Sequence, residues 1–378
     1  MNALLLGCGE MGGEALQDLY QYGNFDKIVV GTRGTDKAER LVRTLRGKKT
    51  HIAVVPVDAN DEDALVSLMN GAAVVVNCVG PNYAYELPIT RAAIRARVNL
   101  VDLNDEFETT FKMYELDEAA RHAGITVVLG LGGSPGIDNI LVRAAANQLD
   151  EVREIHTAWV MSGADPGGLA LSYHLLYSLS GLGLTYRNGK LDEIQSFRDG
   201  KERLEFPEPV GALDVYHIGH PEPVTLARSF PDAAVIDNKA TFNPPLVNAE
   251  IVRLGNMVRE GTGPHRIDGR DMDVMDTAAS SLHRMCRNLG GVSKQAALRV
   301  NVKGRKKNKA RSIFYSSVGG LAPATGIPAS IGALMLAEGR VSAKGVLPPE
   351  ECIEPSDFLY EILTRRNVAP LNGWVEEG

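Results

Sequence analysis

Three glycines near the start of the chain have the spacing of a phosphate-binding turn. Gly7, Gly9 and Gly12 form the pattern G-x-G-x-x-G between an apolar run and an amphipathic stretch. The first glycine permits a tight bend, the second admits a pyrophosphate, and the third lets helix and strand pack closely. The free N–H groups at the start of the helix, which includes Glu10 and Met11, would bind the same phosphates. The pattern predicts a dinucleotide site; a tight turn without a ligand is the plainer alternative.

The next strand-like run ends without the acid that an NAD-binding protein places about 20 residues past the glycines. Thr32 and Arg33 stand there instead, in the stretch IVVGTRGTD. A carboxylate at this place repels a 2′-phosphate, whereas an arginine pairs with one. NADP(H) is therefore the preferred cofactor and NAD(H) the second choice. The alternative is an Arg33 that only projects into water from a turn.

Later strand ends supply the other candidate contacts to the cofactor. Asp58 ends the third run, where it either reaches an adenine or belongs to the cap of the following helix. The remaining candidates lie in turns after the fourth and sixth runs, and they are Val79, Gly80, Gly133 and Pro135. Glycine-rich turns at strand ends allow a ligand to approach the backbone closely.

Polar residues after the fourth and fifth runs are candidates for a substrate pocket. Tyr83 and Glu86 follow the fourth run, and Asp102 and Asn104 lie at the tip of the fifth. Asp102 is the best carboxylate for binding a substrate amine. Surface packing is the alternative for Tyr83, and capping of the next helix is the alternative for Asp102.

The elements that must position these residues alternate over the first third of the chain. Six apolar runs are separated by amphipathic stretches; they span residues 3–7, 27–32, 51–57, 73–79, 98–103 and 125–131. Alternating strands and helices predict an α/β fold with a Rossmann-like, doubly wound parallel sheet. Ligands of such sheets lie outside the carboxyl ends of the strands, where the candidate residues stand.

A second domain begins where this alternation stops. From about Ile155 the chain consists of turn-rich, strand-like segments with clustered prolines, and a helical pattern returns near Thr325. We predict an α+β domain with a mostly antiparallel sheet at residues 131–324. Residues 1–130 together with 325–378 would form the dinucleotide-binding domain, against which the helix from Thr325 is expected to pack.

Composition narrows the class of protein. A chain of 378 residues, 44% hydrophobic and 23% charged, is typical of a soluble globular protein with two domains. The net charge of −7 argues against nucleic acid or an anionic membrane as a partner, and the basic run KGRKKNKAR fits a hairpin turn. No apolar run approaches the ~20 residues of a membrane span. The first strand leaves no room for a signal peptide, so the expected compartment is cytoplasmic. The four cysteines are not closely spaced, and we expect no metal site.

These motifs carry a resemblance that runs over nearly the whole chain. GCGEMGG, VDLND, GLGGSPGIDNIL, LSYHLLYSLSGL and YHIGHPEPVTLARSFP resemble the saccharopine dehydrogenase family in the broad sense. That family includes saccharopine reductase, lysine 6-dehydrogenase and carboxynorspermidine dehydrogenase. The resemblance implies an oxidoreductase of amino-acid metabolism that transfers hydride at a C–N bond, with an inserted substrate-binding and dimerisation domain, in a homodimer. Thr32-Arg33 departs from the lysine 6-dehydrogenase branch, which has an aspartate near this position.

A small amino-acid-like substrate requires a cation for its carboxylate. Arg228 in VTLARSFP is the candidate, because a guanidinium binds a carboxylate through two parallel hydrogen bonds, and Thr225 would assist. Tyr173 is a further substrate-binding candidate. The candidates for proton transfer are Lys239, His217 and, as a second histidine, His220. The plainer alternatives are a surface ion pair for Arg228, solvation for the lysine and structural roles for the histidines.

Two other classes of protein share parts of this pattern. A non-enzymatic NADPH-binding sensor or assembly factor would keep the glycines without a substrate pocket. A thioester-type semialdehyde dehydrogenase would need a nucleophilic cysteine beside a base. Cys78 lies within the fourth apolar run, where a core position is the better interpretation.

Overall fold

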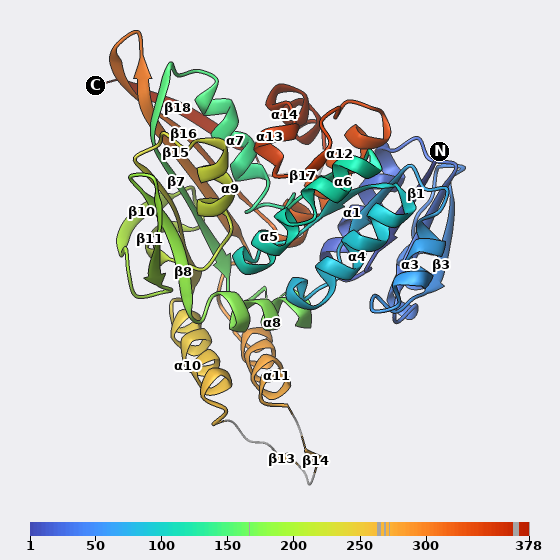
Figure 1. Cartoon of the computed structure of the whole chain (residues 1–378). Helices are drawn as coiled ribbons and strands as arrows, with labels where there is room; N and C mark the ends of the chain where they lie inside the picture. Colours follow the sequence, from blue (N-terminus) through green and yellow to red (C-terminus); the bar gives the residue numbers. More distant parts are fainter. Residues whose placement is uncertain (166, 263–265, 268–269, 272, 366–369, 378) are drawn as a thin grey trace. The chain divides into compact units, whose positions relative to one another are not determined.

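The chain divides into two compact units. The computed structural model describes residues 1–165, 167–262, 266–267, 270–271, 273–365 and 370–377. Unit 1 consists of Met1–Ile140 and Ala322–Val368, and unit 2 of Leu141–Leu321 and Ala369–Gly378 (Figure 1). The domain boundaries expected after residues 130 and 324 stay a prediction.

Unit 1 is built on a parallel sheet of seven strands in the order β17-β6-β5-β4-β1-β2-β3. The strands are β1 (Asn2–Leu6), β2 (Lys27–Thr32), β3 (His51–Pro56), β4 (Val74–Asn77), β5 (Asn99–Asp102), β6 (Thr126–Val128) and β17 (Gly345–Leu347). Every neighbouring pair in this order is parallel. The predicted doubly wound α/β fold is confirmed.

Helices cover both faces of this sheet. They are α1 (Glu10–Tyr22), α2 (Asp36–Val42), α3 (Glu62–Met69), α4 (Asn82–Ala96), α5 (Phe107–Tyr114), α6 (Asp117–Ala123), α7 (Ile137–Ala146, which continues into unit 2), α12 (Leu321–Ala337), α13 (Pro349–Cys352) and α14 (Pro355–Leu363). Strand β1 shows why two layers are needed. Ala3 and Leu5 pack into one apolar core with α1 and α12, whereas Leu4 and Leu6 pack into another with α3 and α4. Successive side chains of a strand point to opposite faces, so a run of apolar residues requires cover on both.

The C-terminal part of unit 1 returns to the sheet as expected. Strand β17 pairs with β6, and α12 packs directly on the start of α1. A Cβ atom at Gly326 of α12 would lie 2.3 Å from the carbonyl oxygen of Met11. The helix begins four residues before Thr325, because a proline at position 323 is compatible with a first helical turn.

A buried ion pair holds this returning segment. Asp18 of α1 accepts hydrogen bonds from Ser330 of α12 at 2.6 Å and from Arg365 at 3.1 Å. The side chains of Asp18 and Arg365 are each 4% exposed, and the guanidinium also lies over the ring of Tyr22. Elements 347 residues apart in the sequence are thereby joined inside the core.

Unit 2 contains a mixed sheet of nine strands. They are β7 (Glu151–Ser162), β8 (Leu182–Arg187), β9 (Lys190–Gln195), β10 (Glu202–Phe206), β11 (Gly211–His217), β12 (Val235–Asn243), β15 (Ala296–Lys306), β16 (Lys309–Gly319) and β18 (Leu371–Glu377). The main order is β10-β11-β12-β7-β15-β16-β18, with β8 and β9 joined to β12. Only β12 and β7 run parallel among these pairs, so the prediction of a mostly antiparallel sheet is confirmed.

Four helices and a short hairpin complete unit 2. They are α8 (Leu169–Ser178), α9 (Glu222–Ser229), α10 (Leu246–Glu260), α11 (Val274–Arg287), β13 (Arg266–Ile267) and β14 (Arg270–Asp271). The basic run KGRKKNKAR forms the hairpin turn between β15 and β16, with Lys307 and Asn308 at positive φ. Strand β18 pairs with β16, although the sequence interpretation had grouped these last residues with the first domain.

No helix in the described part of the chain combines the length and apolar character that a membrane crossing requires.

The buried ion pair generates a stability prediction. We expect Asp18→Ala to lower the free energy of unfolding by about 3 kcal/mol, because it removes the buried carboxylate that pairs with Arg365 and leaves only the partly exposed Glu361 as a partner. Arg43→Ala is the control, since it removes an exposed pair with Glu39 that is worth at most about 1 kcal/mol. Urea unfolding of both variants measures the difference, and equal losses would contradict the anchoring role of Asp18.

Candidate cofactor and substrate sites

The glycine-rich turn between β1 and α1 has the geometry of a phosphate site. Gly7 has a φ of +79°, which favours glycine, and a Cβ at Gly12 would lie 2.0 Å from the carbonyl oxygen of Gly7. Gly9 is the N-cap of α1 and has no atom of the protein within 4 Å of its virtual Cβ. The first-turn N–H groups, among them those of Glu10 and Met11, therefore face space that a pyrophosphate can fill.

The sheet topology places this turn at the switch point. Strand β1 lies between β2 and β4, so the connections from β1 and β4 leave in opposite directions. The turns after the two strands touch, because a Cβ at Gly7 would lie 2.7 Å from the carbonyl oxygen of Cys78. Ligands of doubly wound sheets bind in the crevice at this position.

The end of β2 carries the residues expected to select the cofactor. Thr32 donates a hydrogen bond to the carbonyl of Gly34 at 3.4 Å, Arg33 is exposed, and a Cβ at Gly34 would meet nothing within 4 Å. Gly31 leaves no free room for a ligand, because side chains of Leu6 and two other residues would lie within about 3 Å of a Cβ there.

Sequence reasoning missed a second cation beside this turn. Burial raises the pKa of the Cys8 thiol, and the charge of Lys37 opposes that shift, so Lys37 of α2 lies near the glycine-rich turn. Its position four residues after Arg33 was the available signal, because α2 begins immediately after the β2 turn. Arg33 and Lys37 are thus two cations at this end of the site, with the carboxylate of Asp36 between them in the sequence.

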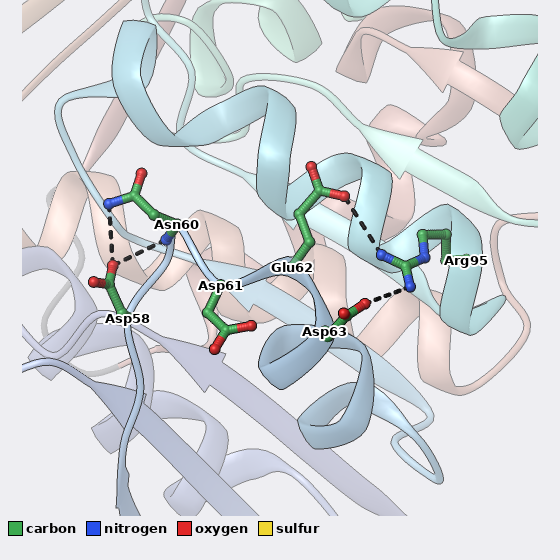
Figure 2. A pocket seen from close by; sticks show the side chains of 6 residues that line it. All are labelled: Asp58, Asn60, Asp61, Glu62, Asp63 and Arg95. Carbon is green, nitrogen blue, oxygen red and sulfur yellow. Dashed lines mark hydrogen bonds and ion pairs between the residues drawn. The ribbon is translucent and has the colours of Figure 1, made fainter.

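The turn after β3 forms an open pocket of 580 Å³, shown in Figure 2. Asp58 accepts two hydrogen bonds from Asn60, at 3.0 and 3.1 Å, while Asp61 caps α3 through the N–H of Ala64. The cap of α3 thus belongs to Asp61. Asp58 stays a candidate for the adenosine end, on the exposed rim.

The pocket is acidic apart from one arginine. Arg95 of α4 pairs with Asp63 at 2.6 Å and with Glu62 at 3.5 Å, as the dashed lines in Figure 2 mark. The pairs are exposed on the surface, so they contribute little to stability. They hold α3 and α4 side by side next to the β3 turn.

A side-chain bond orders the turn after β4. Asn77, the last residue of β4, accepts the N–H of Val79 at 3.0 Å through Oδ1 and donates through Nδ2 to Glu86 at 3.0 Å. Val79 and Gly80 are therefore held by the end of the strand, and Tyr83 follows in the first turn of α4. These three stay candidates for the cofactor and substrate contacts.

The end of β5 is buried rather than open. Asp102 has no exposed surface, and its Oδ1 accepts the N–H groups of Asn104 at 2.9 Å and Gly130 at 2.7 Å. Asn104 is buried as well and donates to the hydroxyl of Thr110 at 2.9 Å. Glu106, not Asp102, is the N-cap residue of α5. This geometry favours a positioning role for Asp102 over the substrate contact that the sequence predicted.

Two carboxyl groups share this buried region. Burial raises the pKa of Asp102 to about 7, although its two backbone hydrogen bonds oppose the shift. Burial and then the charge of Asp102 raise the pKa of Glu86 well above its ordinary range. At neutral pH the two groups together therefore retain protons that exposed carboxyl groups would have lost.

The turn after β6 packs against α12 within unit 1. A Cβ at Gly133 would lie 3.2 Å from the carbonyl oxygen of Ala324, and Pro135 accepts the N–H of Gly132 at 2.8 Å. Asn139 donates to Glu350 at 3.0 Å, which ties α7 to the C-terminal segment. Gly133 and Pro135 thus lie in a tightly held turn at the carboxyl end of the sheet.

In unit 2, two of the proton-transfer candidates have structural contacts. Lys239 forms an ion pair with Glu202 at 2.5 Å, and its backbone is the register partner of His217. The ring of His217 packs against Gly200, where a Cβ would lie 2.0 Å from its Cδ2, and burial lowers the pKa of this histidine. These contacts favour the structural alternative for His217, whereas Lys239 is not the solvated lysine of the plainer alternative, because its side chain is only 12% exposed. Both residues stay candidates.

The second histidine has the arrangement of an oriented base. His220 Nδ1 lies 2.7 Å from Oε2 of Glu222, and both side chains are buried. The ring of Trp159 lies 5.5 Å from that of His220, and His174 lies 6.1 Å from it, centroid to centroid. A carboxylate on Nδ1 fixes the tautomer and the orientation of the ring.

Helix α9 carries the predicted carboxylate-binding residues. Thr225 is buried and Arg228 is exposed, and their spacing of three residues puts them on one side of the helix. Tyr173 of α8 donates through its hydroxyl to Asp276 at 2.6 Å. Thr225 and Arg228 thus lie about one turn apart on α9, while Tyr173 binds a carboxylate of α11.

The cysteines do not provide an activated nucleophile. The four residues are free thiols, and burial raises the pKa of Cys78, with the carboxyl groups of Glu86 and Asp102 adding to the shift. A thiol in this environment stays protonated at neutral pH, which argues against thioester chemistry at Cys78.

Comparison with known proteins identifies the first domain. Residues 3–128 match the family described as Saccharopine dehydrogenase NADP binding domain. The chain is 24% identical over 400 residues to carboxynorspermidine synthase of Vibrio cholerae, covering 95% of this chain and 94% of the relative. It is 21% identical over 389 residues to carboxyaminopropylagmatine dehydrogenase of Synechocystis, with the same coverage.

A solved structure shows the same fold over the whole chain. The apo saccharopine dehydrogenase (L-Glu forming) of Saccharomyces cerevisiae superposes with a TM-score of 0.70 at 15% identity, covering 99% of both chains. Residues 3–128 therefore match an NADP-binding domain found in saccharopine dehydrogenases, and the cofactor of this chain is NADP(H).

Proposed function

We propose that this protein is an NADP(H)-dependent oxidoreductase that acts on a C–N bond of an amino-acid-like substrate. The observation that carries the proposal is the β1 turn, where Gly9 leaves the start of α1 open, combined with Arg33 in the place of an acid. The names of the relatives support a carboxylated amine as the substrate class. These relatives are a synthase of carboxynorspermidine and dehydrogenases of carboxyaminopropylagmatine and saccharopine.

NADP(H) supplies the hydride chemistry, and the protein must orient the substrate and move a proton. Arg228 would bind the substrate carboxylate through paired hydrogen bonds, with the Thr225 hydroxyl beside it on α9. Removal of hydride from the carbon of an amine gives an iminium, and the nitrogen must release a proton for a neutral imine to form. His220, oriented by Glu222, is the residue that we propose for this proton.

We further propose a cytoplasmic homodimer, which the family resemblance supports. The competing function is a non-enzymatic NADPH sensor. A screen of imines and amines that follows NADPH absorbance separates the two, because a sensor binds NADPH without consuming it with any substrate.

The first prediction concerns cofactor selection. We expect the wild-type protein to bind NADPH more tightly than NADH, and Arg33→Ala to weaken NADPH binding by roughly 10- to 150-fold, the worth of a charge-assisted hydrogen bond. NADH affinity should stay unchanged. Fluorescence titration with both cofactors measures this, and Arg46→Ala, an exposed arginine after α2, is the control. Tighter binding of NADH by the wild type would contradict the assignment.

The second prediction concerns the substrate carboxylate. Arg228→Ala should raise KM by at least tenfold and leave NADPH affinity unchanged, while Arg228→Lys should recover only part of the loss, since lysine lacks the planar fork. Arg253→Ala, which removes an exposed ion pair with Glu250, serves as the control. Steady-state kinetics on the best substrate measures KM for each variant. A wild-type KM in Arg228→Ala would show that Arg228 does not bind the substrate.

The third prediction concerns the proton. His220→Gln should reduce kcat by about 10²- to 10⁴-fold, the range of general acid–base catalysis, and should abolish the acidic limb of the pH–rate profile. Glu222→Gln should reduce kcat less, because the imidazole remains in place. His217→Gln is the matched comparison, and a larger loss of kcat there than at His220 would transfer the role to His217.

A further inference from the structure

Two buried carboxyl groups lie together at the ends of β4 and β5. Asn77 and Asp102 are register partners in the sheet, and Asn77 donates to Oε2 of Glu86 at 3.0 Å. The hydroxyl of Thr90 contacts the other oxygen of Glu86 at 3.4 Å. Neither carboxyl group has any exposed surface, and the proposed reaction does not use Glu86.

A proton is required to join these two groups. Asp102 uses Oδ1 for two backbone N–H groups, and these bonds favour its ionised form. Its Oδ2 is buried and receives no N–H or hydroxyl donor among the described residues. The Glu86 carboxyl is the neighbouring group that can bond to this oxygen. Two carboxylates repel each other, so such a bond needs a proton on Glu86.

We propose that Glu86 is a positioning residue: as a neutral carboxylic acid it donates to ionised Asp102 and ties the ends of β4, β5 and β6 into one platform for the cofactor. The platform comprises Glu86, Asn77 and Asp102. Through Asn77 it holds the N–H of Val79 in the turn after β4, and through Asp102 it holds the N–H of Gly130 in the turn after β6. Both turns contain candidate cofactor contacts, so the role of the platform rests on the proposed cofactor site.

The surroundings of the platform make a second negative charge costly. The titratable groups that face it are Cys78 at the end of β4 and Asp105 and Glu106 in the segment before α5. None of these groups offers a positive charge. Loss of the shared proton would therefore leave two adjacent buried carboxylates, and the hydrogen bond between Glu86 and Asp102 would break.

The pH dependence has a defined sign. Burial raises the pKa of both carboxyl groups in the folded protein, so the folded state holds protons that the unfolded state releases in the ordinary acidic range. Stability then falls as the pH rises from that range through the folded pKa values, which are about 7 for Asp102 and well above the ordinary range for Glu86. Order in the two turns should be lost with the proton of Glu86, because ionised Asp102 is the form that accepts its hydrogen bond.

Infrared difference spectroscopy and NADPH titration test the platform. The wild type should show the C=O stretching band of a protonated carboxylic acid at neutral pH, and Glu86→Gln should lack it. NADPH affinity of the wild type should fall above neutral pH by up to about tenfold per pH unit, the limit for one proton. Glu86→Gln should give a flatter profile, because a carboxamide N–H donates without titrating. Glu39→Gln, on the exposed face of α2, is the control.

Each result of these two experiments tests a different part of the proposal about Glu86. Absence of the acid band from the wild type, or its persistence in Glu86→Gln, overturns the shared proton. Identical pH profiles of NADPH affinity in the two proteins overturn the positioning role. If Glu86→Gln does not fold, the pH titration of the wild-type acid band still shows whether a carboxyl group keeps its proton at neutral pH. If the wild type does not bind NADPH, the proposed function fails, and the band and the thermal midpoint against pH still test the carboxyl pair.

Discussion

The contact between the first strand and the first helix is the constraint on which unit 1 depends. Gly12 lies so close to the carbonyl of Gly7 that a Cβ would sit 2.0 Å from that oxygen. This contact aims the start of α1 at the crevice between β1 and β4, and the open space at Gly9 follows from it. Helix α12 then packs on the same turn of α1, with Gly326 against Met11, so the return of the chain depends on the geometry that exposes the helix N-terminus.

Much of unit 1 could be predicted because its signals are local. The alternation of apolar runs and amphipathic stretches predicted the parallel sheet, and the glycine spacing predicted the β1 turn. Strand ends were less predictable. The run 125–131 is a strand only from Thr126 to Val128, because Gly130 at φ +70° turns the chain so that its N–H meets Asp102.

The roles of polar residues were harder to predict, because they depend on partners distant in the sequence. Asp102 looked like an open carboxylate, yet a glycine 28 residues later covers one of its oxygens. Lys239 looked like a free cation, yet Glu202 on a strand two places away in the sheet pairs with it. His220 is an exception, because its partner Glu222 is only two residues away, and the local sequence His-Pro-Glu was the signal that could have favoured it over His217.

The ion pair between Asp18 and Arg365 has a consequence for how the chain is made. Synthesis from the N-terminus delivers Asp18 long before Arg365, with residues 141–321 of unit 2 between them. Until residues 321–365 have left the ribosome, the first helix lacks both the apolar cover of α12 and its cation. The apolar face of the parallel sheet that α12 covers therefore stays exposed while most of unit 2 is made. A nascent chain would complete its nucleotide-binding unit only when this returning segment docks.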